Sequence, residues 1–216
     1  KLLLLLLGLL ATAAAWAQKG ILNFSYTYNG KTVLYNQLSL SHTNPTASVD
    51  GQLSGTNHNN VSGDLELPDT VYDRTTAYSL VQLGSSAFQN CSTLTSVIIP
   101  NSVTEIKSLA FEQCYSLASV TLPNAITTIQ SHTFDNCTSL VSINIPNSVT
   151  AIYGGAFYQC TSLSPLTVPS SVDTIGANAF YGVPIVVYAG TASGSPWGAT
   201  RLFAAQDGDL YFSDAA

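Results

Sequence analysis

The chain has 216 residues, of which 46% are hydrophobic and only 8% are charged. The hydrophobic content excludes disorder as the general state, and the length allows one or two domains. The formal net charge of −6 and the absence of any basic cluster give no basis for a nucleic-acid partner.

The first 17 residues have the pattern of a signal peptide. Lys1 precedes the apolar run 2–10, and Ala15-Trp16-Ala17 provides a cleavage site before Gln18. A membrane anchor is the alternative, but the run is short for a span, and a lipoprotein is disfavoured because no Cys follows it. We expect an extracellular or cell-surface chain that begins at Gln18 and has no membrane span after cleavage. Because the sequence contains no Met, we also expect that its reading frame is incomplete.

Residues 18–66 are predicted to form a β-rich N-terminal cap. Alternating aromatic residues at 24–28 lead into Asn29-Gly30, and a second alternating run follows at 33–35. This pattern is typical of a β-hairpin with a type I′ turn. The segment 42–60 is rich in Ser, Thr, Asn and Gly and is predicted to be a loop.

Residues 67–182 contain an internal repeat of 23 residues. Each unit has seven apolar anchor positions, including one Phe and, three positions later, one Cys. One unit buries too few side chains to offset the entropy of ordering its backbone, so the units must stack on one another. The Phe and Cys anchors, which we expect to be buried, are Phe88, Cys91, Phe111, Cys114, Phe134, Cys137, Phe157, Cys160 and Phe180.

Each unit is predicted to contain two short strands and one corner. Apolar residues alternate inward in 94–99, and Pro100 ends this strand because it has no N–H to donate. Residues 103–106 form a second extended pass, and the Ser-x-Ala-Phe-x-x-Cys pattern, as in 108–114, has room for one helical turn. The expected fold class is therefore an α/β repeat solenoid of short strands with single helical turns.

The first unit is atypical. Residues 65–71, Leu-Glu-Leu-Pro-Asp-Thr-Val, match residues 97–103, Val-Ile-Ile-Pro-Asn-Ser-Val. Pro68 and Pro100 lie one repeat plus nine residues apart, so we expect a nine-residue insertion within 71–80. An irregular terminal unit is what a cap at the open end of a stack requires.

Two of the units closely resemble the BspA-like class of leucine-rich repeats, which is found in surface proteins of mucosal anaerobic bacteria and some protozoan parasites. They are 99–117, Ile-Pro-Asn-Ser-Val-Thr-Glu-Ile-Lys-Ser-Leu-Ala-Phe-Glu-Gln-Cys-Tyr-Ser-Leu, and 145–163, Ile-Pro-Asn-Ser-Val-Thr-Ala-Ile-Tyr-Gly-Gly-Ala-Phe-Tyr-Gln-Cys-Thr-Ser-Leu. The resemblance covers 80–182 directly. Pro100, and Ser102 where an Asn usually stands, depart from the general leucine-rich pattern, so we expect the 23-residue variant.

The period fails at Val183, which stands where the next Cys would fall. Residues 183–188 predict an apolar strand, Trp197 is placed to cover the last unit, and 207–212 predict a hairpin. We assign 183–216 to a C-terminal cap or to the start of a truncated further module. In related proteins a similar Gly-Ser-Pro-Trp-Gly-Ala segment leads into more repeats, so we expect further sequence after the last residue.

The four Cys occupy one position on successive units. In an exported chain, disulfides between neighbouring units are one alternative. We favour buried reduced thiols, because a thiol also fits as a small core residue. A tetrahedral zinc site is excluded, since four sulfurs in a row cannot converge on one ion.

No catalytic, metal-binding or cofactor-binding residue is predicted, and we expect a protein that is not an enzyme. His42, His58 and His132 have no nucleophile or paired carboxylate at a meaningful spacing. Asp207 and Asp209 supply fewer oxygens than calcium needs and are expected to lie in a turn.

Two function hypotheses follow. In the first, the chain is a binding module with a neutral face of short side chains, and the family resemblance implies adhesion to host extracellular matrix or another cell-surface macromolecule. In the second, it is a structural spacer or cap of a larger surface protein. An uncharged face should bind almost independently of salt. The predicted ligand face consists of Ser96, Ile98, Ser119, Thr121, Ser142, Asn144 and Thr167.

Overall fold

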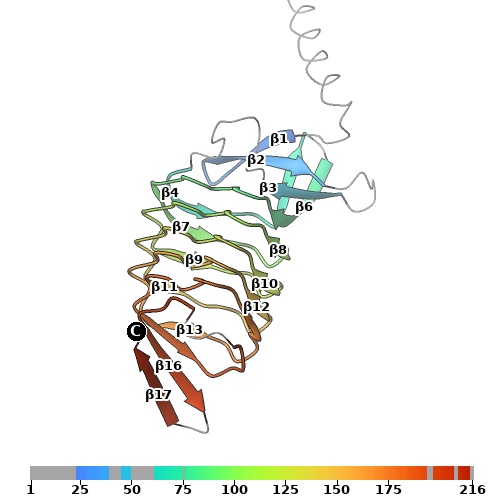
Figure 1. The fold of residues 1–216 in the computed structure, drawn as a ribbon. Coiled ribbons are helices and arrows are strands. Elements are labelled where there is room, and N and C mark those ends of the chain that lie inside the picture. The colour runs from blue at the N-terminus through green and yellow to red at the C-terminus, as the bar shows by residue number, and fades with distance from the viewer. Residues whose placement is uncertain are drawn as a thin grey trace, which may run out of the picture.

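The computed structural model describes residues 23–38, 45–49, 61–74, 76–193, 197–206 and 209–214. These residues form strands and turns that are stacked into a series of coils (Figure 1). The predicted signal peptide lies outside the described residues, as do His42, His58 and Asp207. Nowhere in the described ranges is there a helix that is long and apolar enough to cross a membrane.

A sheet at the N-terminal end covers the first coil (Figure 1). Its strands lie in the order β1-β2-β3-β6-β5, and β8 of the stack pairs with β6. The hairpin predicted around Asn29-Gly30 is confirmed, because β1 and β2 are antiparallel and both turn residues have the positive φ of a type I′ turn. The strands are β1 (Asn23–Tyr28), β2 (Lys31–Gln37), β3 (Thr46–Val49), β5 (Thr70–Asp73) and β6 (Thr76–Leu83).

Two segments of this sheet, β3 and the β5–β6 hairpin, have structures that the sequence pattern did not predict. The loop predicted over 42–60 is wrong at Thr46–Val49, because this segment pairs with both β2 and β6 and buries Ala47 and Val49 completely. The nine-residue insertion forms the antiparallel β5–β6 hairpin, after which β6 runs parallel to β8 in the next coil. Strand β6, which continues from this hairpin, therefore connects the cap sheet to the stack through the pairing of Gln82 and Leu83 with β8.

Two parallel ladders run along the stack. On one side the order is β11-β9-β7-β4, and on another it is β10-β12-β14. The register pairs Val97 with Val120 and Ile129 with Ile152, which are 23 residues apart, so the repeat length is the length of one coil. The strands are β4 (Gly63–Glu66), β7 (Leu94–Ile98), β9 (Ser119–Thr121), β11 (Ser142–Ile143), β8 (Glu105–Ile106), β10 (Thr128–Ile129), β12 (Ala151–Ile152) and β14 (Thr174–Ile175).

The predicted helical turns are not present, so the α/β class is corrected to strands and turns. In the corner that contains Phe88, the N–H groups of Ser86, Phe88 and Asn90 donate to carbonyls of the next coil. In an α-helix, those N–H groups would instead donate to carbonyls four residues earlier in the same segment. In addition, two residues of each corner have positive φ, which interrupts a right-handed helix. The recurring positive-φ residues are Ser86, Leu109, His132, Gly155, Asn178, Asn90, Gln113, Asn136, Gln159 and Gly182.

The core of the stack is a column of phenylalanines beside a column of cysteines. The five Phe rings are completely buried and stacked, with centroid separations of 5.4, 5.5, 5.4 and 6.1 Å along the column. All four thiols are reduced and buried, as predicted. Each of the last three donates to the carbonyl of the Phe from the preceding unit, as Cys137 does to Phe111 at 3.2 Å.

The C-terminal end is closed by a different arrangement. Trp197 packs edge-on against Phe180, with centroids 6.3 Å apart, and against Tyr188 at 5.5 Å, so the predicted cover of the last unit is confirmed. Val183 takes the place of a Cys and is completely buried. The predicted strand and hairpin are present in a sheet ordered β13-β15-β16-β17. These strands are β13 (Leu166–Val168), β15 (Ile185–Tyr188), β16 (Arg201–Gln206) and β17 (Asp209–Asp214).

Candidate functional site

The strand-lined face, defined as the outer surface of β4, β7, β9 and β11 with the residues that follow them, carries side chains in columns. Alternation along each strand turns Val97 and Val120 inward and leaves their neighbours outside. The parallel register then places equivalent outer residues side by side. One column is Asp64, Ser96, Ser119 and Ser142, and the next begins with Glu66, Ile98 and Thr121.

The structure places all of the predicted ligand-face residues at the surface. Ser96 is half-buried, Ile98 is 49% exposed, and the other five are exposed. Six of them belong to consecutive coils of one ladder. Thr167 lies on β13, which pairs with β15 rather than with β11.

The ladder is interrupted between β11 and β13. Pro165 occupies the repeat position of Ser142 and Ser119, and a proline cannot donate a hydrogen bond to a neighbouring strand. Of the described strands, β11 pairs with β9 alone, and β13 begins a separate sheet. Sequence reasoning did not predict this interruption, although a Pro within a strand repeat is a readable signal.

Two adjoining grooves hollow the strand-lined face. The cap groove has a volume of about 560 Å³ and extends from Tyr28 of the N-terminal hairpin to Asn144. The second groove, of about 420 Å³, lies at the interruption between Ser142 and Thr167. Asn144 lines both, so the two grooves adjoin at this residue on the predicted face.

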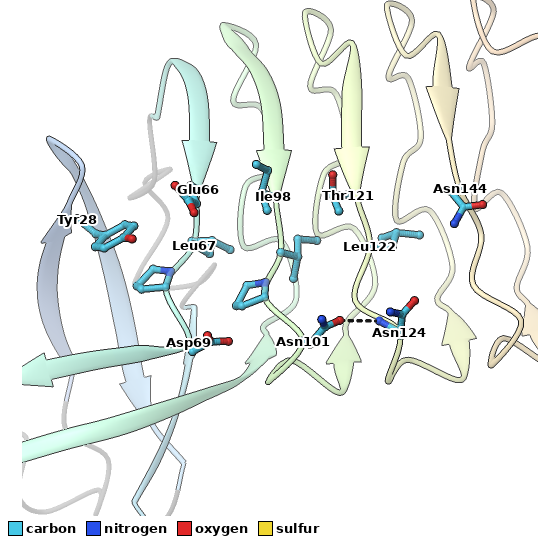
Figure 2. A pocket seen from close by; sticks show the side chains of 13 residues that line it. Tyr28, Glu66, Leu67, Asp69, Ile98, Asn101, Thr121, Leu122, Asn124 and Asn144 are labelled. Carbon is cyan, nitrogen blue, oxygen red and sulfur yellow. Dashed lines mark hydrogen bonds between the residues drawn. The ribbon is translucent and has the colours of Figure 1, made fainter.

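The cap groove has an apolar floor between two rows of exposed side chains (Figure 2). Leu67, Ile99 and Leu122 are buried in the floor. Glu66, Ile98, Thr121 and Asn144 form one row, and Asp69, Asn101 and Asn124 form the other. The second row is ordered by a hydrogen bond from the Asn124 backbone N–H to Asn101 Oδ1, at 3.0 Å.

Carboxylates stand at the cap end of the face, which sequence reasoning treated as neutral. Asp64 Oδ1 accepts hydrogen bonds from Ser96 Oγ at 2.6 Å and Thr95 Oγ1 at 2.8 Å, which hold the pKa of Asp64 below its usual value. Glu66 accepts from Asn29 Nδ2 at 3.1 Å. The expectation of nearly salt-independent binding therefore does not extend to this end. The match between residues 65–71 and 97–103 already aligned Glu66 with Ile98.

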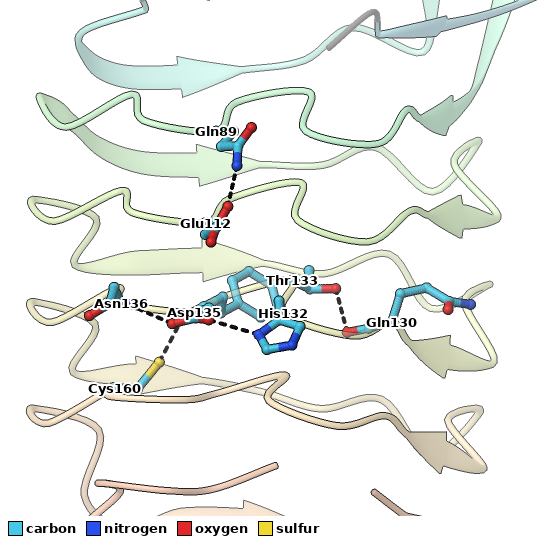
Figure 3. A network of polar contacts seen from close by, with 9 residues as sticks. Gln89, Glu112, Gln130, His132, Thr133, Asp135, Asn136 and Cys160 are labelled. Carbon is cyan, nitrogen blue, oxygen red and sulfur yellow. Dashed lines mark hydrogen bonds and ion pairs between the residues drawn. The ribbon is translucent and has the colours of Figure 1, made fainter. Parts of the chain in front are cut away.

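A second polar network lies on the corner turns, and its contacts are structural (Figure 3). Asp135 is buried and accepts from Asn136 Nδ2 at 2.7 Å, and its other oxygen lies 2.7 Å from His132 Nδ1. Gln89 donates to Glu112 on the neighbouring coils of the same column. The Cys160 thiol also lies beside Asp135, but it is completely buried and donates to the Phe134 carbonyl at 3.1 Å, so it adds no accessible nucleophile to the His132–Asp135 pair. No group of three or more potential metal ligands occurs in the described ranges.

The thiols offer no reactive centre. Burial raises the pKa of Cys91, Cys114, Cys137 and Cys160, so that the nucleophilic thiolate is disfavoured. Each side chain is also fully covered by the core. A protein nucleophile needs the opposite conditions, namely a lowered pKa and access to substrate.

The sequence of the stack defines a family. The model of the BspA type leucine-rich repeat region matches residues 73–186 in six copies, which is more than half of the chain. The chain therefore belongs to the BspA-type leucine-rich repeat family. A comparison with curated proteins found no match.

Solved structures of bacterial proteins show the same fold. A leucine-rich repeat protein from Bacteroides ovatus is 26% identical, with a TM-score of 0.60 over 83% of this chain and 45% of that protein. The T. pallidum leucine-rich repeat protein TpLRR is 27% identical, with a TM-score of 0.60 over 75% of this chain and 71% of its own. The pneumococcal vaccine antigen PcpA, at 18% identity and a TM-score of 0.52 over 87% and 53%, shares the fold alone. This chain thus spans less than half the length of the Bacteroides ovatus protein.

Proposed function

We propose that the chain is an exported, non-catalytic binding module whose strand-lined face recognises a macromolecule of the host extracellular matrix or of another cell surface. The observation that carries this proposal is the pair of adjoining grooves, because both lie on the face predicted from sequence and share Asn144. Family membership adds support, since leucine-rich repeats commonly present an extended binding surface.

The backbone supports recognition by a preorganised surface. Ser96, Ser119 and Ser142 are held side by side by the parallel ladder, and short side chains lose little rotamer freedom when a ligand covers them. Binding therefore requires little ordering of the protein. A long neutral row of hydroxyl and amide groups suits a macromolecular partner better than a small ion.

A structural spacer is the second candidate. It is supported by the length comparison, because the chain covers only 45% of the Bacteroides ovatus protein. In that reading the stack holds another segment at a distance, and its face has no ligand of its own.

The test is binding by the chain from Gln18 onward, immobilised and screened against purified matrix proteins. The face variant Thr121→Lys/Asn144→Lys places two long cations in the row and should abolish capture. The control variant Thr104→Lys/Thr127→Lys adds the same charge at exposed positions before β8 and β10, on another side of the stack, and should bind as the wild type does.

Three results would count against the proposal. Undiminished binding by the face variant would move the site elsewhere, and no binding to any surface macromolecule would favour the spacer. Export is tested separately by mass spectrometry of the secreted protein, which should begin at Gln18. Retention of residues 2–10 would contradict cleavage of a signal peptide.

A further inference from the structure

We propose that the cap groove takes an extended segment of a partner protein that carries a Lys or Arg at the cap end and an aliphatic or proline side chain next to it. This inference rests on the proposed function and specifies its ligand. It is carried by the shape of the groove, by the charge at one end, and by the spacing of the coils.

The shape supplies the apolar contact. The floor is formed by Leu67, Ile99 and Leu122, and the half-buried rings of Pro68 and Pro100 line the same groove. Ile98 is a large apolar side chain that is 49% exposed beside this floor. A partner side chain placed here would remove apolar surface from water on both molecules, which favours an aliphatic or proline residue.

The charge distinguishes the two ends of the groove. Glu66 stands in one row and Asp69 in the other, on either side of the floor at the end nearest the cap (Figure 2). None of the lining residues is a cation, and neither carboxylate forms an ion pair within the described part of the chain. Toward Thr121 and Asn144 the lining is uncharged. A cation placed between the two carboxylates therefore sets the direction in which the segment lies.

The coil spacing sets the length of the segment. The groove crosses the levels of β4, β7, β9 and β11, and neighbouring strands lie about 4.8 Å apart, so it extends about 14 Å along the stack. An extended chain rises about 3.3 Å per residue, so about four to five residues fill the groove. The side chains beyond the apolar one then face Thr121 and Asn144, which can donate and accept hydrogen bonds.

The experiment is a selection of random heptapeptides displayed on phage against the chain from Gln18 onward, followed by affinity measurements on the enriched synthetic peptides. We expect enriched sequences with a Lys or Arg beside an aliphatic residue or proline. The variant Glu66→Gln/Asp69→Asn should bind these peptides roughly two- to thirtyfold more weakly, the range expected from two exposed ion pairs. Raising the NaCl concentration from about 0.05 to 0.5 M should weaken wild-type binding in the same direction.

A matched control removes the same charge elsewhere. Glu112→Gln/Asp173→Asn changes one carboxylate on the corner turns and one next to β14, neither of which lines the groove, and should leave peptide affinity unchanged. Thermal unfolding curves should be alike for both variants, because each substitution keeps an acceptor oxygen and nearly the same volume. A variant that is less stable than the control would be replaced by the single substitution Asp69→Asn, which should retain a measurable loss of affinity.

The inference is overturned if enriched peptides lack a basic residue, if they bind Glu66→Gln/Asp69→Asn as well as the wild type, or if no peptide is enriched. The inference can fail while the proposed function holds. This is the case when Thr121→Lys/Asn144→Lys abolishes binding to a matrix protein but Glu66→Gln/Asp69→Asn leaves that binding unchanged. The proposed function fails instead when Thr121→Lys/Asn144→Lys binds without loss.

Discussion

The repeat stack and the N-terminal sheet bury aromatic side chains in contrasting ways. In the stack, Phe134 lies between Phe111 and Phe157 at 5.5 and 5.4 Å, and the same contact recurs in every coil. In the N-terminal sheet, Phe24 contacts Tyr35 at 5.8 Å and Tyr78 at 5.1 Å, in an arrangement that occurs once. The stack therefore depends on repetition, and the sheet depends on particular partners.

This difference indicates how each region holds together. A coil contributes its own residues and two interfaces with its neighbours, so a substitution at a repeat anchor disturbs both interfaces. The sheet closes the exposed end of the first coil by backbone pairing between β6 and β8. If the comparison is correct, equivalent positions in the stack should respond alike except where a unit departs from the repeat.

The largest expected effect comes from a central anchor. Phe134→Ala should lower the free energy of unfolding by roughly 3 to 5 kcal/mol, because a completely buried ring is lost from the column. Tyr153→Ala is the control, since Tyr153 is 38% exposed, and it should change stability by on the order of 0.5 kcal/mol. Denaturant unfolding of both variants checks this. Equal shifts would reject the register of the repeat.

The next effect tests a unit that departs from the repeat. A Cβ on Gly176 would lie 2.4 Å from the Gly154 backbone N and 2.8 Å from the Tyr153 carbonyl carbon. Gly176→Ala should therefore destabilise the fold by about 1 to 3 kcal/mol, as overpacking does. A Cβ on Gly154 would lie 3.2 Å from the Ala177 carbonyl oxygen and 3.9 Å from the Ala177 backbone N, so Gly154→Ala should cost less. A melting temperature for Gly154→Ala at or below that of Gly176→Ala would contradict the close approach of the two coils.

The cysteine column predicts a loss of stability in alkali. Burial raises the thiol pKa in the folded state, whereas unfolded thiols ionise near pH 9, so the unfolded state releases more protons as the pH rises. The contribution of each buried thiol to the free energy of unfolding should be fully present below the pKa of the unfolded thiol. One pH unit above that pKa, it should have fallen by on the order of 1 kcal/mol per thiol.

The double variant Cys114→Ala/Cys137→Ala isolates this effect. Each substitution should cost roughly 1 to 2 kcal/mol at neutral pH through the cavity that it leaves. Between pH 8 and 10 the variant should lose less stability than the wild type, because two buried thiols no longer titrate. Parallel pH profiles for the two proteins would show that the thiols ionise equally well in the folded state.

The smallest expected effect comes from Ser148 and Ser102, which occupy the same repeat position. Ser148 lies within the stack, and Ser102 lies near its junction with the cap. Ser148 Oγ donates to the Ile126 carbonyl at 2.7 Å, whereas the buried Oγ of Ser102 has no partner in the described structure. Ser148→Ala should cost about 1 kcal/mol, and Ser102→Ala should be neutral or slightly stabilising. Calorimetry on the two variants measures the sign of each change in unfolding free energy. A larger loss of stability for Ser102→Ala than for Ser148→Ala would show that the Ser102 hydroxyl has a hydrogen-bond partner.

The sequence alone determined the period, the anchors and the stacking. An inward Phe or Cys that recurs at a constant interval stacks against the same residue of the neighbouring unit, so the burial of these anchors follows from composition and spacing. The Asn29-Gly30 hairpin was also predictable, because few residue pairs adopt positive φ at two successive positions. The same alignment placed Ser119, Thr121 and their equivalents on the surface of the strands.

Only the tertiary structure decided the corners and the ends of the face. The corner N–H groups bond to carbonyls about one repeat away in sequence, and no local propensity can indicate that choice over a helical turn. Likewise, β3 becomes a strand because β2 and β6 lie beside it. The rows that bring Glu66 and Asp69 to either side of one groove depend on the register in which β4 pairs with β7. Hydrogen bonds between distant segments determine these features, which is why the sequence pattern alone did not.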